Sequence, residues 1–119
     1  MLLDSNIVIY AFQPQHESLR SFLEQGEFAV SAITRLEVLG YWRLSSDEYE
    51  RLHLFLAEMP LLHVTPAIIE AAIQLRLKRR MGLADALIAA TALQHHLPLV
   101  THNLRDFQDI EGLEVIDPL

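Results

Sequence analysis

Short apolar runs alternate with helical segments along the whole chain of 119 residues, and this alternation constrains the fold more than any other feature. Five such runs read as strands, at residues 1–4, 28–30, 61–64, 99–101 and 113–116. Strands that alternate with helices usually form a parallel sheet with right-handed crossovers. We therefore predict an α/β fold, in which a central, mostly parallel sheet is flanked by helices in three layers, with 113–116 as an edge strand.

Capping and breaking residues mark the helices between these runs. We expect helices at about 6–12, 16–24, 31–42, 47–59, 65–80 and 83–96, with a short one at 103–107. Ser31 is a favourable N-cap, Ser45 and Glu48 can form a capping box, and Thr65 precedes a proline at the first helical position. The helix at 83–96 is apolar nearly all round, so we expect it to be buried.

Length and composition indicate one folded domain over residues 1–119. Half of the residues are hydrophobic (51%) and 21% are charged, which excludes a disordered chain. The absence of cysteine excludes disulfides, cysteine nucleophiles and thiolate metal sites, and it fits a cytoplasmic location. No signal peptide or membrane-spanning segment is expected.

The net charge of −7 argues against a nucleic-acid partner, because phosphate binding favours a basic surface. Two features weaken this objection. A group of acids that holds a divalent cation presents positive charge to a phosphate. The basic charge is also concentrated, since four of the nine Lys and Arg residues are Arg76, Lys78, Arg79 and Arg80. These four are either phosphate contacts or a solvated helix end favoured by the helix dipole.

The acidic residues fall where a parallel sheet would bring them to one edge. Asp4 ends the first strand, Glu37 lies less than two turns into the helix after the second strand, and Asp85 opens the helix before the fourth. Asp106 follows the fourth strand directly. In such sheets, ligands bind at the carboxyl ends of the strands. Acids that repel each other need a counter-charge, and Mg²⁺ or Mn²⁺ is the simplest one, which points to phosphodiester hydrolysis.

Four motifs, in order and at this spacing, resemble those of PIN-domain ribonucleases, and most closely the VapC-type toxins of toxin–antitoxin pairs. They are Leu3-Asp4-Ser5-Asn6, residues 31–37, residues 84–92 and residues 101–107. The resemblance runs from end to end and implies a PIN-like fold and a Mg²⁺- or Mn²⁺-dependent endoribonuclease that leaves a 5′-phosphate. It also implies a homodimer and inhibition by a cognate VapB-like antitoxin that occludes the site.

Carried over by motif, Asp4, Glu37 and Asp85 match the three core acids of the family. Asn103 stands where many PIN domains have Asp, and we predict Asp106 as the fourth acid, with Asn103 as a neutral ligand or orienting residue. All four acids are predicted to be catalytic and to bind metal, with Asp4, Asp85 and Asp106 as ligands and Glu37 as a ligand of a second ion or as the base. The residues predicted to hold the carboxylates in place are Ser5, Asn6, Thr101 and Asn103.

Two other classes of function stay open on the sequence. A haloacid-dehalogenase-like phosphatase also places an Asp at the end of strand one, but it requires a second Asp where this chain has Asn6 and a downstream lysine, of which Lys78 is the only one. A non-catalytic PIN-like module that binds RNA or a protein would not need the intact acids.

Other side chains invite a functional interpretation that we do not adopt. The histidines at 95, 96 and 102 lack the spacing of a helical zinc site. Tyr41 and Trp42 are interpreted as core or dimer contacts. The stripe of Tyr49, Leu52, Leu56 and Met59 is interpreted as core or as an antitoxin groove.

Overall fold

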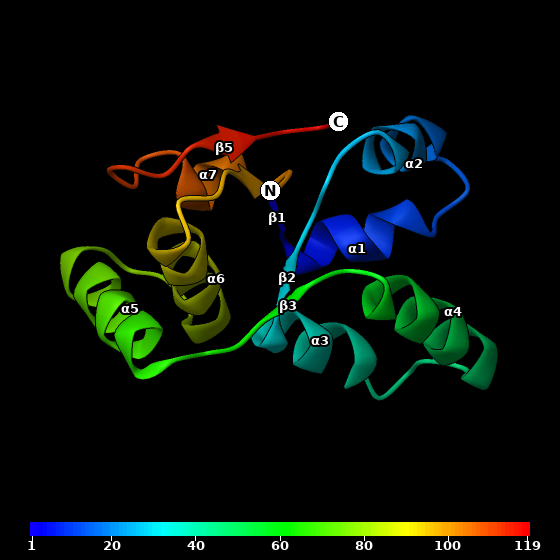
Figure 1. Cartoon of the computed structure of the whole chain (residues 1–119), viewed down its shortest axis with the longest axis horizontal. Coiled ribbons are helices and arrows are strands. Elements are labelled where there is room, and N and C mark those ends of the chain that lie inside the picture. Colours follow the sequence, from blue (N-terminus) through cyan, green and yellow to red (C-terminus); the bar gives the residue numbers. More distant parts are fainter.

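The protein is described by a computed structural model that covers residues 1–119 (Figure 1). All of its paired strands run parallel. The strands are β1 (Leu2–Leu3), β2 (Val30–Ser31), β3 (Leu61–Leu62), β4 (Leu99–Val100) and β5 (Val115–Ile116). They pair in the orders β1-β4-β5 and β2-β3, and a parallel bridge between Leu2 and Ala29 joins the two groups. The resulting order is β3-β2-β1-β4-β5, so the prediction of a parallel sheet with 113–116 at its edge is confirmed.

Seven helices connect and cover these strands. They are α1 (Ser5–Ala11), α2 (Glu17–Glu24), α3 (Ala32–Leu39), α4 (Ser46–Ala57), α5 (Pro66–Lys78), α6 (Leu83–Gln94) and α7 (Leu104–Phe107). The predicted caps are confirmed: Ser31 accepts from the main-chain N of Ile33, Ser45 and Glu48 form a capping box, and Thr65 caps α5. No helix is both long enough and apolar enough to cross a membrane.

The helix predicted to run from Ser31 to about Trp42 is shorter, because it ends at Leu39 with Gly40 as its C-cap. A Cβ at position 40 would collide with the main-chain oxygen of Leu36, so glycine permits this close final turn. Tyr41 and Trp42 follow in a loop and are 52% and 78% exposed. The interpretation of these two aromatic residues as core is therefore wrong.

The strands were also predicted to be longer than the two residues that pair in each. The run 61–64 stops at Leu62 because His63 and Val64 lead directly into Thr65, the residue that caps α5. The apolar runs still mark every strand correctly, since each predicted run contains at least one residue of its strand.

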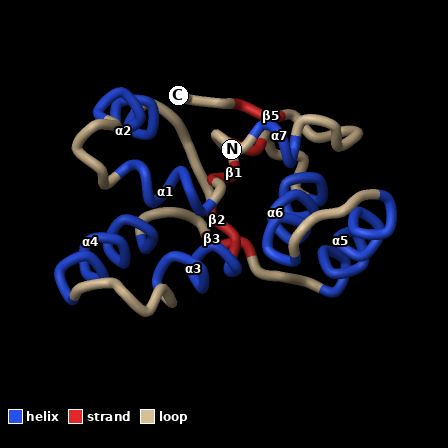
Figure 2. The backbone as a smooth tube through the Cα atoms, turned by 180° about the vertical axis from the view of Figure 1, so that it is seen from behind, coloured by secondary structure: helices blue, strands red, loops and turns tan.

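Alternate residues of β1 point to opposite faces of the sheet, and each face has its own core. Leu3 packs with Ile7 and Val8 of α1 and with side chains from α2, α3 and α4. Leu2 packs on the other face with Ile88 and other residues of α6. Figure 2 shows α1 and α2 on one side of the strands and α5 and α6 on the other.

The all-round apolar helix α6 is buried between the sheet and α5, as its sequence predicted. Its alanines at 86, 89, 90 and 92 are fully buried, and small side chains of this kind let a helix lie close to its neighbours. The outer helix α5 packs along α6 (Figures 1 and 2). The N-terminal end of α6, which carries Asp85, is thereby held near the carboxyl ends of β1 and β4.

Candidate active site

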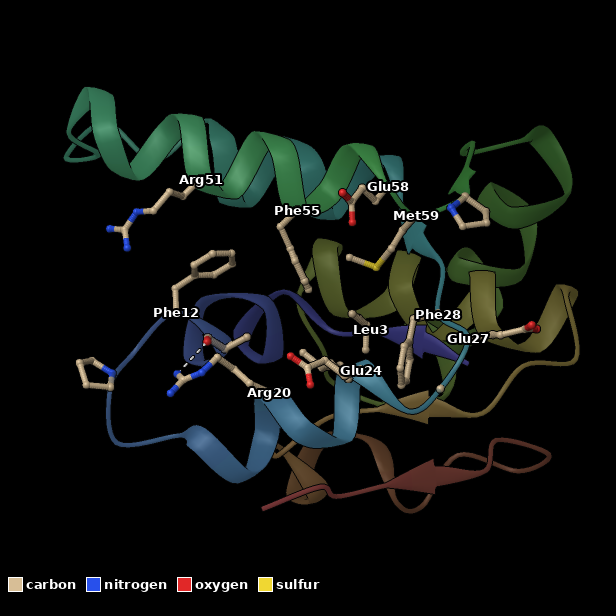
Figure 3. Close-up of a pocket in the computed structure, with 15 residues that line it drawn as sticks. Leu3, Phe12, Arg20, Glu24, Glu27, Phe28, Arg51, Phe55, Glu58 and Met59 are labelled. Carbon is tan, nitrogen blue, oxygen red and sulfur yellow. Dashed lines mark hydrogen bonds between the residues drawn. The ribbon is translucent and has the colours of Figure 1, made fainter.

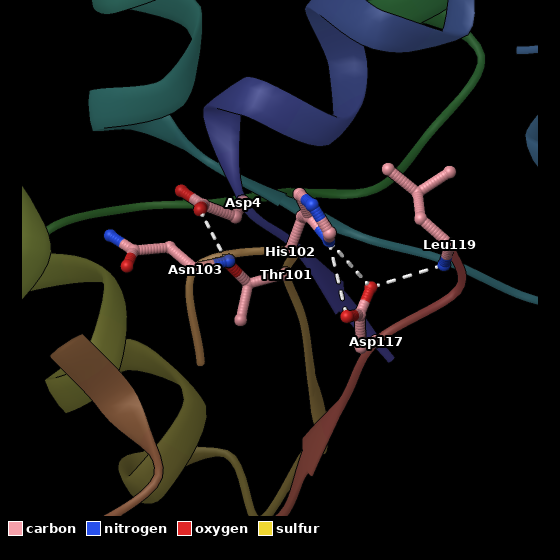
Figure 4. A network of polar contacts seen from close by, with 6 residues as sticks. All are labelled: Asp4, Thr101, His102, Asn103, Asp117 and Leu119. Carbon is pink, nitrogen blue, oxygen red and sulfur yellow. Dashed lines mark hydrogen bonds and ion pairs between the residues drawn. The ribbon is translucent and has the colours of Figure 1, made fainter. Parts of the chain in front are cut away.

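Asp4 occupies the carboxyl end of β1 and is only 4% exposed. It is also the N-cap of α1, and its Oδ1 accepts a hydrogen bond of 2.8 Å from the main-chain N of Ser5. Its Oδ2 accepts a second bond, of 2.7 Å, from Oγ1 of Thr101 at the end of β4 (Figure 4). Both carboxylate oxygens are thus held, which fixes the side chain at the junction of two central strands.

Glu37 reaches the same edge from the second turn of α3. Its Oε1 accepts a hydrogen bond of 2.6 Å from Oγ of Ser5, and that hydroxyl also lies 3.4 Å from Oγ1 of Thr34. Ser5 was predicted to hold a carboxylate, and the structure places its hydroxyl on Glu37. It therefore connects the first turn of α1 to α3.

Asp106 lies in α7, where Asn103 orients it. The side-chain amide of Asn103 donates to Oδ2 of Asp106 over 2.7 Å. The main-chain N of Asn103 donates to Oγ1 of Thr101 over 3.0 Å. Thr101 consequently links the Asp4 carboxylate to the residue that orients Asp106. This contact favours the orienting role that the sequence left open for Asn103.

Asp85, in the first turn of α6, has the most perturbed carboxyl group of the site. Its pKa is raised from 3.8 to about 6, chiefly by loss of solvation on partial burial and then by the charges of Asp4, Asp106 and Glu37, in that order. Burial likewise raises the pKa of Asp4, although the hydrogen bonds from Thr101 and Ser5 oppose the shift. The four acids therefore interact electrostatically across one sheet edge.

No protein cation neutralises these acids, since the only ion pair in the molecule joins His102 to Asp117. No three acidic or histidine side chains converge into a ready-made metal cage. Mg²⁺ and Mn²⁺ do not require one, because Mg²⁺ usually keeps several waters and uses one or two carboxylates. An edge that offers only carboxylate and amide oxygens, with raised carboxyl pKa values, fits a hard divalent cation.

One residue that was predicted to hold a carboxylate makes no such contact, and two histidines that were not assigned to the site lie away from it. Asn6 is exposed, and its side-chain amide makes no hydrogen bond to a carboxylate. The histidines at 95 and 96 are exposed at the far end of α6, away from the first-turn Asp85.

The basic cluster divides into two kinds of residue. Arg79 is half-buried: its Nη2 donates to the main-chain O of Asp106 over 3.0 Å, and its Nε is buried without a partner. Nε of Arg76 donates to the main-chain O of Met81 over 3.1 Å. Lys78 and Arg80 are exposed and form no ion pair. Nothing in the sequence pattern indicated that Arg79 would turn inward to α7.

A groove of ≈ 980 Å³ lies apart from the acids, between α1, α2 and α4 (Figure 3). Its floor is apolar and includes Phe12, Phe28, Phe55 and Met59, with Arg and Glu side chains along its length. A second hollow, of ≈ 390 Å³, shares Phe12 with this groove and extends to Glu37. Phe12 and Arg51 line both hollows, and Glu37 is the only one of the four acids that lines the smaller one. Of the predicted stripe, Leu52 and Leu56 of α4 belong to the core, and Met59, just beyond the end of α4, lines the groove. Tyr49 is exposed and belongs to neither.

Comparison with known proteins finds relatives along nearly the whole chain. A family model described as "PIN domain" matches residues 1–113. "Ribonuclease VapC1" of Rickettsia felis is 32% identical and covers 98% of this chain and 94% of its own length. "tRNA(fMet)-specific endonuclease VapC" of Shigella flexneri is 29% identical, with 98% and 96% covered. A solved "Toxin-antitoxin complex from Klebsiella pneumoniae" superposes with a TM-score of 0.84 at 32% identity, covering 99% of this chain and 97% of that one.

Proposed function

The chain belongs to the PIN domain family, and from this premise we propose that it is the endoribonuclease toxin of a VapBC-type toxin–antitoxin pair, dependent on Mg²⁺ or Mn²⁺. One observation carries the proposal. Asp4, Asp85, Asp106 and Glu37 lie close enough to interact electrostatically at one edge of the sheet, and no basic side chain of the protein forms an ion pair with them. The relatives named as a ribonuclease and a tRNA-specific endonuclease support RNA as the substrate. We propose that residues 1–119 act as one functional unit in the cytoplasm.

We assign Asp4, Asp85 and Asp106 as the residues that hold the metal. When bound there, Mg²⁺ or Mn²⁺ acts as a Lewis acid toward the phosphate and lowers the pKa of a coordinated water. Thr101 and the main-chain N of Ser5 hold Asp4, and Asn103 holds Asp106, so these carboxylates need little reorganisation. With its pKa raised to about 6, Asp85 is ionised in most molecules at neutral pH and can serve as an anionic ligand.

Glu37 is assigned as the general base. Its Oε1 is occupied by the hydroxyl of Ser5, which leaves Oε2 to accept a proton from the attacking water. The water oxygen forms a bond to phosphorus, and the 3′ oxygen leaves with the electron pair of its bond to phosphorus and takes a proton from solvent. The products therefore carry a 5′-phosphate and a 3′-hydroxyl. The exposure of Lys78 and Arg80 supports their assignment to RNA phosphates.

The alternative functions have less support. A phosphatase of the haloacid-dehalogenase kind needs an acid two residues after Asp4, and that position is the exposed Asn6. In a non-catalytic module, the buried Asp4 and the half-buried Asp85 would lower stability without any benefit to binding.

The apolar groove supports the antitoxin part of the proposal. We assign the groove between α1, α2 and α4 to an amphipathic segment of a VapB-like antitoxin, because a neighbour at 32% identity is itself a toxin–antitoxin complex. The smaller hollow that continues to Glu37 would let an extended part of that segment cover the acids. A Phe55→Asp variant should lose co-purification with the protein encoded beside this gene, whereas Leu54→Asp, on the exposed face of the same helix, should retain it.

The homodimer is assigned to the exposed apolar row of α5, which borders a hollow of ≈ 840 Å³ shared with Leu83 and Leu87 of α6. Ile69, Ile73 and Leu77 recur at four-residue spacing and are 42%, 44% and 74% exposed. Two α5 helices that pack antiparallel about Ile73 would place Ile69 opposite Leu77 and Glu70 opposite Arg76. This pairing joins apolar to apolar and acid to base. An Ile73→Glu variant should elute as a monomer, and a dimer of unchanged size would refute the assignment.

RNA cleavage by the metal-stripped protein tests the nuclease itself. The purified protein should cut RNA when Mg²⁺ or Mn²⁺ is added and stop when EDTA is added in excess. The new ends should be substrates for 5′-phosphate-dependent ligation. Cleavage that persists in EDTA, or ends that carry a 2′,3′-cyclic phosphate, would exclude the proposed chemistry.

A further inference from the structure

The three residues that follow β4 point alternately to two sides of the chain. Thr101 and Asn103 face the acids, where they hold Asp4 and Asp106 respectively. His102, between them, points away from the acids toward the C-terminal segment after β5 (Figure 4). The chain bends at His102, and the main-chain N of Asn103 turns back to Oγ1 of Thr101. Of these three residues, His102 is therefore the one whose side chain contacts the C-terminal segment.

His102 makes a close polar contact with that C-terminal segment. Its Nδ1 lies 3.1 Å from both carboxylate oxygens of Asp117, and Oδ1 of Asp117 also accepts from the main-chain N of Leu119 over 3.0 Å. The ring of Tyr10 meets the His102 ring edge-on, with centroids 6.4 Å apart. The His102 side chain is 53% exposed and that of Asp117 is 22% exposed.

The contact between His102 and Asp117 lies just beyond the paired ends of β4 and β5. The main-chain N of Thr101 donates to the main-chain O of Ile116 over 2.9 Å, next to the pair in both strands. After this bond, the side chains of His102 and Asp117 continue to join the two segments. A backbone shift at His102 would be passed directly to Thr101 and Asn103, its neighbours in the chain.

We propose that His102 and Asp117 form a positioning pair, in which the contact between their side chains fixes the 101–103 segment and so sets the placement of Asp4 and Asp106. The inference rests on the proposed function, because the consequence of misplacement is read from metal binding and cleavage. Neither residue touches the acids, so the pair acts through Thr101 and Asn103. Small displacements of metal-binding groups are costly, since residues behind metal ligands typically contribute 10–100-fold to metal affinity or activity.

The test compares three substitutions of His102 in the full chain at one fixed neutral pH. In His102→Asn, the side-chain amide stands close to the position of Nδ1 and can still donate to Asp117. His102→Gln places its amide further out, and His102→Ala removes the donor. We expect the Gln and Ala variants to lose about 10-fold in Mn²⁺ affinity, measured without RNA, and about 10-fold in kcat, with an unchanged KM for RNA. The Asn variant should retain most of both.

A second set of variants separates positioning from general structure. Asp117→Ala should match His102→Ala, and the double variant should be no worse than either single one, since all three break the same contact. His95→Ala and Asp109→Asn, at exposed positions outside the contact, should match the parent. If His102→Ala and His102→Gln bind Mn²⁺ and cut RNA as the parent does, the positioning role is excluded. A parent that neither binds Mn²⁺ nor cuts RNA would instead overturn the proposed function.

Discussion

The hydroxyl of Thr101 donates to Oδ2 of Asp4 over 2.7 Å and joins the ends of two neighbouring strands whose residues are 97 positions apart in the sequence. Because both residues are buried, this contact is made away from water, where a hydrogen bond to a charged group contributes most. The same hydroxyl accepts from the main-chain N of Asn103. One threonine thus connects the acid at the end of β1 to the segment that orients Asp106.

Replacement of Thr101 tests this connection. Thr101→Val keeps the shape but removes the donor, so we expect kcat to fall by about 10-fold or more, with little change in KM for RNA. Thr101→Ser keeps the hydroxyl and should stay within about threefold of the parent. Cleavage kinetics of both variants provide the measurement. An equal loss in both variants would indicate a packing effect of the missing methyl group instead.

Asp85 should lower the stability of the metal-free protein at neutral pH. Its folded-state pKa of about 6 lies above the ordinary 3.8, so the native state holds a proton in this interval that the unfolded chain releases. The free energy of unfolding therefore falls as the pH rises from about 4 to 6, and it stays lower above this interval. The effect is reduced by solvent screening, because Asp85 is only half-buried.

Asp85→Asn removes this unfavourable charge. Without metal at pH 8, we expect Tm to rise by about 2–5 °C, as for a gain of about 1 kcal/mol in a domain of this size. At pH 4 the variant and the parent should unfold at nearly the same temperature. Thermal unfolding at both pH values is the measurement, with Asp109→Asn as the matched control for an exposed acid. A Tm below that of the parent at pH 8 would contradict the electrostatic account.

Divalent metal should stabilise the protein most where the acids are charged. Addition of Mn²⁺ at 100 times its Kd should add about 2.7 kcal/mol to the free energy of unfolding at pH 8. The gain should be smaller at pH 5, because Asp85 then keeps its proton and metal binding must displace it. The measurement is Tm against Mn²⁺ concentration at the two pH values. The same shift at both would show that Asp85 is not a ligand.

The basic residues at the C-terminal end of α5 should differ in function according to their burial: we expect the exposed ones to bind RNA and the half-buried Arg79 not to. Arg80→Ala and Lys78→Ala should weaken RNA binding and reduce the slope of log K against log salt by about 0.7–0.9 for each phosphate that the variant no longer neutralises. Arg79→Ala should leave this slope unchanged and lower kcat, since Arg79 contacts α7 behind Asp106. Binding titrations over a range of salt concentrations will check this. A reduced salt slope in Arg79→Ala would show that Arg79 also contacts RNA phosphates.

Much of the fold follows from local signals in the sequence. The caps at Ser31, Ser45 and Thr65 act within one turn of the chain, so a single sequence is enough to locate them. The end of α3 depends instead on the close approach of Gly40 to the oxygen of Leu36. The exposure of Trp42 depends on tertiary packing, because no other element of the fold covers the loop in which it lies. Neither is visible in the periodicity of apolar residues.

In the site, too, some features could be predicted from the sequence and others depend on tertiary structure. Parallel topology brings the carboxyl ends of the strands to one edge, which is why the meeting of Asp4, Asp85 and Asp106 could be predicted. The partner of each carboxylate depends on side-chain direction within a helical turn. Because α1 begins at Ser5, this residue turns toward α3 and Glu37, whereas Asn6 turns to solvent. Sequence spacing alone does not separate these two neighbours.

Metal-dependent cleavage by the Asp4→Asn and Asp85→Asn variants tests the central claim most directly. Single-turnover cleavage of RNA should be measured for the metal-stripped parent, both variants and Asp109→Asn after Mn²⁺ is restored. Loss of a ligand that holds the metal should remove several kcal/mol of transition-state stabilisation, so both variants should be at least about 100-fold slower while Asp109→Asn matches the parent. If Asp4→Asn and Asp85→Asn cut RNA as fast as the parent, the acidic edge is not the catalytic centre.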